Sequence, residues 1–341
     1  MSLKAPATLR LIADQCGVSM TTVSKILRGK YKGNTPKGKK SVEAVTDLAR
    51  KMGYIANGSA RRLRDGRHRA IVVVVPVDPS GHPAFFTYEY ITGIASILSR
   101  ERYSLSLATY PSMQPDLAIG RLSDRNFDGA IVLEESGQEL DRFLSAAAIP
   151  TIYVNVEPQR GRRSIYRDER AAGRSLVELL AAIGYRRMYV VGGTPRVGGH
   201  FSLTDRHAGI REAIEASGMA MTINDIEVWE SGFDESILNA KLTPDTVVVS
   251  LGSAAALRLM RCIPRGQPLA CCDDAHIFIN IAPGLTRATF DRTSMGRAAA
   301  ESILARIDDP AAVPRYDTFR PGIHLGSSTP PVAPRQPVPA T

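Results

Sequence analysis

The sequence has few cysteines and no long apolar segment. Its four cysteines, Cys16, Cys262, Cys271 and Cys272, have the spacing of neither a metal site nor a disulfide framework. No apolar run approaches the ~18–20 residues that a membrane helix requires. The amino-terminal segment MSLKAPATLR also lacks the apolar core of a secretory signal. These absences predict a protein of the reducing cytoplasm with no membrane partner.

Motifs of catalysis and cofactor binding are also lacking. The six histidines are scattered without ligand spacing, and neither a G-x-S-x-G elbow nor an H-E-x-x-H helix occurs. The stretch GGTPRVGG at 192–199 lacks the Lys-Ser/Thr of a phosphate-binding loop and the spacing of a dinucleotide fingerprint, which predicts a simple turn. We therefore expect no enzyme, no catalytic residue, no metal site and no cofactor.

Positive charge is concentrated in the first fifth of the chain. Residues 1–69 carry 16 Lys and Arg against 4 Asp and Glu, whereas the remaining residues carry 27 against 30. A basic segment attached to a nearly neutral body is typical of a protein that binds a polyanion. The alternative is a flexible, solvated basic tail.

Helical periodicity in the basic segment favours a folded head over a tail. The pattern predicts helices over 8–15 and 19–27, a turn at Gly17, and a third helix from about Pro36 to Gly53. Two short helices joined by a glycine turn are typical of a helix-turn-helix. The second helix of that motif enters the major groove of DNA.

From residue 70 onward, apolar runs alternate with helical stretches. Uninterrupted apolar runs indicate strands that are buried on both faces, as in parallel sheets. The predicted fold class is a small all-α helix-turn-helix head plus an α/β body of two doubly wound parallel-sheet subdomains. A proline-rich disordered tail is predicted over 326–341. The predicted strands are 70–77, 103–110, 129–133, 151–156, 187–193, 246–251 and 268–272.

The segments TLRLIADQCGVSMTTVSKIL, MGYIANGSARRL and AIVVVVP resemble, in this order, the LacI/GalR family of bacterial transcription regulators. The resemblance implies a helix-turn-helix DNA-binding domain in 1–56, a hinge helix and linker in 57–69, and an effector-binding and dimerisation core in 70–325. That core would be similar to periplasmic binding proteins. The implied protein is a homodimeric repressor of a pseudo-palindromic operator in double-stranded DNA. A carbohydrate-derived small molecule would control it, as inducer or as corepressor.

The resemblance also assigns DNA contacts by position. Met20 and Thr21 stand at base-reading positions, and Leu63 stands where two paired hinge helices wedge open a base step. Lys25 stands where the family usually has arginine, and lysine cannot make the bidentate contact that arginine makes with guanine. The alternatives are a partly buried Met20 and phosphate contacts alone for Thr22 and Ser24. The predicted DNA contacts are Thr8, Ser19, Met20, Thr21, Thr22, Ser24, Lys25, Asn57, Ala60, Leu63 and Arg64.

The effector contacts that the resemblance implies are Phe85, Phe86, Asn155, Arg206, Phe233 and Asp273. The alternatives are core packing for the two phenylalanines and a helix cap for Asp273.

The chain departs from the family at Leu251-Gly252-Ser253, where Ala-Asn-Asp is common. With Arg206 and Arg287, this departure favours an anionic effector, such as a sugar acid or a phosphorylated sugar. Two other classes stay open: a DNA binder whose pocket has decayed, and an enzyme that uses the cleft of the body.

Overall fold

The computed structural model describes two compact units, Met1–Arg67 and His68–Thr341, here called the head and the body. The described residues are 7–31, 33–54, 66–78, 86–112, 114–134, 137–157, 163–192, 200–217, 220–223, 242–243, 245–313 and 318–332.

The head consists of the three predicted helices, α1 (Leu9–Cys16), α2 (Met20–Leu27) and α3 (Pro36–Lys51). Side-chain caps fix where the first two begin: Thr8 Oγ1 accepts from the amide of Leu11 at 3.2 Å, and Ser19 Oγ accepts from that of Thr22 at 3.1 Å. Gly17, with φ +63°, makes the turn between them. The buried core of the head is Ile12, Ala13, Val23, Ile26, Val45 and Ala49.

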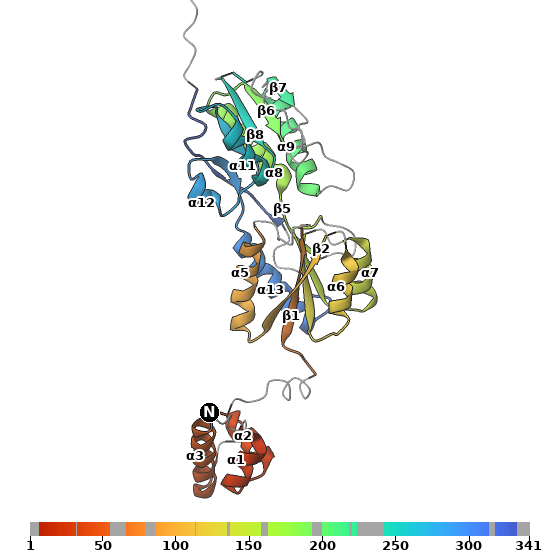
Figure 1. Cartoon of the computed structure of the whole chain (residues 1–341), viewed down its shortest axis with the longest axis vertical. Helices are drawn as coiled ribbons and strands as arrows, with labels where there is room; N and C mark the ends of the chain where they lie inside the picture. Colours follow the sequence, from red (N-terminus) through yellow and green to blue (C-terminus); the bar gives the residue numbers. More distant parts are fainter. Residues whose placement is uncertain are drawn as a thin grey trace, which may run out of the picture. The chain divides into compact units, whose positions relative to one another are not determined.

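The first lobe of the body is a six-stranded sheet in which every pairing is parallel, with strand order β11-β5-β4-β3-β1-β2. Alternate residues of the central strands face opposite layers: Val73 packs with α5 and α13, and Val74 packs with α6 and α7 (Figure 1). Its elements are β1 (Ala70–Val77), α5 (Thr87–Arg100), β2 (Ser104–Pro111), α6 (Pro115–Leu122), β3 (Gly129–Leu133), α7 (Gln138–Ala146), β4 (Thr151–Val154), β5 (Ser164–Arg167), α13 (Arg292–Asp308) and β11 (Thr318–Phe319).

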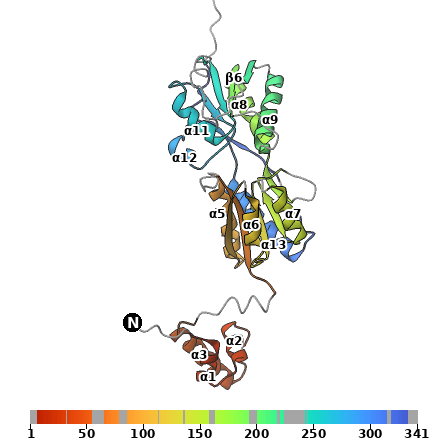
Figure 2. The same cartoon turned by 45° about the vertical axis from the view of Figure 1, so that its right-hand side comes forward.

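The second lobe repeats this arrangement with strand order β12-β10-β9-β8-β6-β7. Figure 2 shows α8 and α9 on one side of this sheet and α11 and α12 on the other. Its elements are α8 (Glu169–Ala182), β6 (Arg187–Val191), α9 (Phe201–Ser217), β7 (Ala220–Ile223), β8 (Thr246–Ser250), α11 (Ser253–Cys262), β9 (Leu269–Cys271), α12 (Phe278–Ile281), β10 (Thr286–Thr289) and β12 (Gly322–His324). The predicted α/β body of two doubly wound subdomains is thus confirmed.

The chain crosses between the lobes at Asp168, at Phe290–Asp291 and between β11 and β12. At the first two crossings an aspartate caps the helix that follows: Asp168 accepts from Ala171 N at 2.9 Å, and Asp291 accepts from Ser294 N at 2.8 Å. The crossings therefore place the end of β5 and the beginnings of α8 and α13 beside one another, at the junction of the lobes.

The sequence prediction missed several strands and misjudged the start of the tail. The pairing of β12 with β10 is antiparallel, so the second sheet is not wholly parallel. Residues 326–332, predicted to be disordered, pack on the second lobe: Ser328 Oγ donates to Leu269 O at 2.6 Å, and Val332 N donates to Ile183 O at 2.8 Å. The prediction was wrong there because proline content does not reveal hydrogen bonds to a neighbouring sheet.

In the described part of the chain, no helix has the length and apolar character that a membrane span requires.

Candidate functional sites

The amino-terminal end of α2 presents its side chains to solvent. Met20 is 53% exposed, and Thr21 and Lys25 are also exposed, whereas Val23 and Ile26 on the opposite face close the core. Met20 is thus free of the core, contrary to the alternative interpretation. A helix anchored in this way offers its first turn to a partner.

The other predicted DNA contacts differ in their exposure and in their hydrogen bonds. Ser19 is committed to the cap of α2 and also lies 2.9 Å from Thr22 Oγ1, and Thr22 and Ser24 are half-buried. Thr8 is exposed and caps α1. The predicted hinge contacts, Asn57, Ala60, Leu63 and Arg64, lie outside the described residues.

At the junction of the lobes, five buried charged residues form what we call the central charge cluster: Arg167, Glu169, Arg206, Asp273 and Arg292. Arg167 and Arg292 belong to the first lobe, and the other three belong to the second.

Asp273 Oδ1 accepts from Arg167 and Arg292 and forms an ion pair with Arg206. Nη1 of Arg167 lies at 2.9 Å, Nη2 of Arg206 at 3.2 Å, and Nη2 of Arg292 at 2.7 Å. Its Oδ2 accepts from Ser253 Oγ at 2.9 Å. Asp273 therefore joins the lobes and caps no helix.

Glu169 completes the cluster. Its carboxylate accepts from Nε of Arg206 at 2.8 Å and lies 2.7 Å from Nη2 of Arg167. Arg206 Nη1 also donates to the carbonyl of Leu251 at 2.5 Å.

These contacts favour the ionised forms of Asp273 and Arg206. Burial by itself would raise the pKa of Asp273, but Arg206, Arg167 and Arg292 hold that pKa well below its ordinary range. Burial would lower the pKa of Arg206, but Asp273 and Glu169 hold it above the ordinary value. Asp273 and Arg206 therefore keep their charges although they are buried.

A second network surrounds Asn155 at the end of β4. Asn155 is fully buried, with a left-handed φ of +60°, and its Nδ2 donates to Glu134 Oε1 at 2.8 Å. Its Oδ1 accepts from Arg167 Nε at 3.0 Å, which connects this network to the central charge cluster. His200 Nε2 lies 3.1 Å from Glu134 Oε2.

Three predicted effector contacts, Asn155, Arg206 and Asp273, thus meet at one place. Phe86 joins them, because its ring lies under the guanidinium groups of Arg167, at 5.7 Å, and Arg292, at 5.2 Å. Phe85 and Phe233 lie outside the described residues. Arg287 is not part of the cluster, since it bonds Asp274 Oδ1 at 2.7 Å and the carbonyl of Leu285 at 3.0 Å.

The sequence analysis overlooked Arg167, Glu169 and Arg292. Each stands at the carboxyl end of a strand or directly beyond one, the position where open α/β sheets bind ligands. The signal was hidden because the strands SIYR and TRAT were not recognised.

The described residues bring together no candidate metal site, and the thiol of Cys272 is buried. No group of three or more His, Cys, Asp or Glu side chains there is placed to hold a metal ion. Burial raises the pKa of the Cys272 thiol to about 12. The reactive thiolate is therefore scarce at neutral pH.

Comparison with known proteins agrees with this geometry. Residues 177–329 match the periplasmic binding protein-like domain family. The chain is 24% identical to the HTH-type transcriptional regulator CelR of Thermobifida fusca, over 92% of this chain and 96% of CelR. It is 25% identical to the HTH-type transcriptional repressor PurR of Haemophilus influenzae, over 88% of this chain and 91% of PurR.

In fold, the chain is similar to the lac repressor dimer bound to operator and the anti-inducer ONPF. The TM-score is 0.76 at 19% identity, and the match covers 96% of this chain and 100% of that one. These likenesses support the resemblance seen in the sequence: relatives named HTH-type transcriptional regulators align with most of the chain, and the lac repressor is similar to it in fold.

Proposed function

We propose that the protein is a homodimeric repressor whose binding to a pseudo-palindromic operator is controlled by a carbohydrate-derived effector. The observation that carries this proposal is the exposed first turn of α2 on a compact basic head, with Met20 and Thr21 turned to solvent. Side chains at this end of a recognition helix reach base edges in the major groove.

The effector site of this proposal is the central charge cluster together with Asn155 and Phe86. Its hydrogen bonds join residues of the first lobe to residues of the second, so a ligand bound there changes how the lobes are held. Such coupling is reciprocal: an inducer that weakens DNA binding is itself bound more weakly in the presence of DNA.

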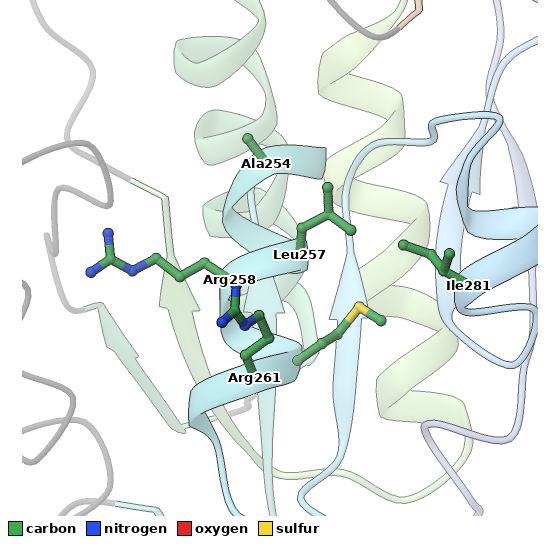
Figure 3. A pocket seen from close by; sticks show the side chains of 6 residues that line it. Ala254, Leu257, Arg258, Arg261 and Ile281 are labelled. Carbon is green, nitrogen blue, oxygen red and sulfur yellow. The ribbon is translucent and has the colours of Figure 1, made fainter.

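The dimer contact of this proposal is an apolar surface made by α11 and α12. Three isoleucines of this region are exposed: Ile277 by 38%, Ile279 by 55% and Ile281 by 52%. Figure 3 shows the side chain of Leu257 turned toward Ile281 and that of Arg258 turned the other way. An open hollow of about 820 Å³ is lined by Ala254, Leu257, Arg258, Met260, Arg261 and Ile281. We call the residues that line this hollow, together with Ile277 and Ile279, the α11–α12 surface.

The lac repressor neighbour supports the same proposal, since it is a dimer bound to operator and to a small molecule. Exposed apolar groups gathered on one face are typical of a surface that another protein covers.

Selection of duplexes from a random DNA library by the full-length protein tests the proposal. We expect a two-fold symmetric sequence that binds at least about 1,000-fold more tightly than a scrambled duplex of the same composition at physiological salt. Equal affinity for selected and scrambled duplexes would contradict the proposal.

A matched pair of threonine variants tests the role of α2. Thr21→Ala should alter the selected sequence at one position of each half-site. Thr46→Ala, in α3, where the hydroxyl donates to Val42 O at 2.7 Å, should leave that sequence unchanged.

A further inference from the structure

Arg292 holds hydrogen-bond donors that the described residues leave unused. Its side chain is fully buried, and its Nη2 donates to Asp273 at 2.7 Å. Its Nε and Nη1 find no hydrogen-bond partner among the described residues, and Glu89 Oε2 lies 3.8 Å from Nη1, beyond hydrogen-bond distance. Buried donors without acceptors are costly. The site is therefore arranged for an acceptor that these residues do not supply.

The acids near Arg292 leave its Nε and Nη1 without a hydrogen bond. Glu134 bonds Asn155 and His200, and Asp274 bonds Arg287. Glu89 Oε1 accepts from His276 N at 3.2 Å, and its Oε2 reaches Nη1 of Arg292 only as an ion pair at 3.8 Å.

Aromatic rings hold the two first-lobe arginines in place. The guanidinium of Arg292 lies 5.2 Å from the ring of Phe86, and that of Arg167 lies 5.1 Å from the ring of Phe290. A cation–π contact holds a guanidinium without using its N–H groups. The nitrogens of Arg167 are engaged with Asn155, Asp273 and Glu169, so the unused donors belong to Arg292. A charged donor of this kind suits an oxygen of a carboxylate or a phosphate.

We propose that the effector carries an anionic group, a carboxylate or a phosphate, which accepts a charge-assisted hydrogen bond from an unused N–H group of Arg292, at Nε or at Nη1. This inference rests on the proposed function, because it names the ligand class of the same effector site. The departure at Gly252 and Ser253 fits it, since arginine donors here take the place of a site built for neutral hydroxyl groups.

The proposal also gives the ligand a way to act on the lobes. Arg167 and Arg292, in the first lobe, both donate to Asp273 of the second. An effector anion on Nε or Nη1 shares the guanidinium that donates to Asp273 through Nη2, so its arrival weakens a link between the lobes.

Calorimetric titration of the full-length protein with paired sugars tests the ligand class. D-gluconate and glucose 6-phosphate are each compared with glucose, and D-galacturonate is compared with galactose. We expect at least one acid to bind at least about 30-fold more tightly than its neutral parent, as the loss of a buried charge-assisted hydrogen bond predicts. The uronate and gluconate arms report a carboxylate, and the phosphate arm reports a phosphoryl group.

Two arginine variants assign the contact to Arg292. Arg292→Gln should weaken binding of the acid about 30-fold, whereas Arg287→Gln, which removes another buried arginine outside the cluster, should leave it unchanged. Arg292→Lys keeps the charge without the planar fork and should give an intermediate affinity. If Arg292→Gln does not fold, as judged by circular dichroism, the comparison of Arg292→Lys with wild type decides.

Three results would overturn the inference: neutral parents that bind as tightly as their acids, no binding by any acid, or an acid whose affinity does not change in the Arg292 variants. The proposed function survives these results as long as the wild type still selects a duplex sequence. Failure of that selection would overturn the proposed function and this inference together.

Discussion

Asp273 accepts hydrogen bonds from Arg167 and Arg292 and forms an ion pair with Arg206, and all three guanidinium groups are buried. Its negative charge offsets the positive charges of Arg167, Arg206 and Arg292 at distances of 2.7–3.2 Å. A buried charge that loses its partner costs far more than an exposed ion pair contributes. The effect of changing Asp273 should therefore greatly exceed that of changing its neighbour Asp274.

We predict that Asp273→Asn lowers the free energy of unfolding by about 3–5 kcal/mol, because it leaves the arginine charges in excess at a buried site. Urea unfolding followed by circular dichroism measures the change. Asp274→Asn is the matched control, since Asp274 is half-buried and pairs with Arg287. Equal losses of unfolding free energy in the two variants would show that the position of Asp273 among the three arginines does not determine the stability of the fold.

His200 should give the body a pH-dependent stability near neutrality. Burial by itself would lower the pKa of His200, but the hydrogen bond and the charge of Glu134 raise it above 6.5. A raised folded pKa means that this stabilisation is complete below about pH 6.5 and is lost as the pH rises through the folded value.

We therefore predict that wild type exceeds His200→Gln in free energy of unfolding by more at pH 6, where the imidazole is charged, than at pH 8.5. Urea titrations at the two pH values measure this difference. Glu134→Gln should reduce the same pH dependence, because it removes the partner that favours the charged imidazole. A difference that does not vary with pH contradicts the assignment.

Sequence alone located part of the site at the level of residues. Asn155, Arg206 and Asp273 were assigned by position, and the structure brings them together. Arg167 and Arg292 were missed because their roles depend on strands too short and too polar to show an apolar pattern. Whether a charged residue is buried beside another is a tertiary fact, which local periodicity does not record.

Close helix packing depends on glycine in both lobes. In the first lobe, a Cβ on Gly296 of α13 would collide with the carbonyl oxygen of Tyr90 in α5. In the second, a Cβ on Gly173 of α8 would collide with the carbonyl oxygen of Arg206 in α9. Backbone atoms cannot rotate away as side chains do, so the helices themselves must separate.

We predict that Gly296→Ala and Gly173→Ala each lower the free energy of unfolding by about 1–3 kcal/mol, the usual cost of overpacking a close contact. Gly120→Ala in α6 is the control, because a Cβ there meets nothing within 4 Å. That variant should gain about 0.5–1 kcal/mol from the higher helix propensity of alanine. Urea unfolding measures all three, and a loss at Gly120 equal to the others would refute the packing argument.

At the level of elements, the sequence predicted most where local signals are strong. The head helices followed from their caps and from Gly17, and the long apolar strands β1 and β8 followed from their unbroken runs. The short strands β5 and β10 escaped notice because their pairing partners, distant in sequence, supply the hydrogen bonds that define them. The local sequence pattern thus indicates where helices and long strands can form. Short strands form only where a strand distant in sequence supplies their hydrogen-bond partners.

The whole molecule, in the proposed function, depends on two copies acting together. A single head contacts one half-site, so affinity for a symmetric operator relies on a partner held at fixed spacing. The α11–α12 surface is the proposed source of that partnership, since apolar side chains there would otherwise remain in contact with water. A charged side chain introduced into this surface should therefore weaken DNA binding, although the substituted residue lies outside the head.

We predict that Ile281→Lys shifts the protein from dimer to monomer in sedimentation velocity and lowers affinity for the selected duplex at least about 100-fold. An ammonium group in an apolar contact must be desolvated, and Arg258 and Arg261, which line the same hollow, carry the same sign of charge. Leu325→Lys is the matched control: Leu325 is also 52% exposed on the second lobe but does not line the α11–α12 surface. The control should remain dimeric. A dimer of unchanged stability in the Ile281 variant would place the contact elsewhere, because no apolar interface accommodates an unpaired charge at its centre without cost.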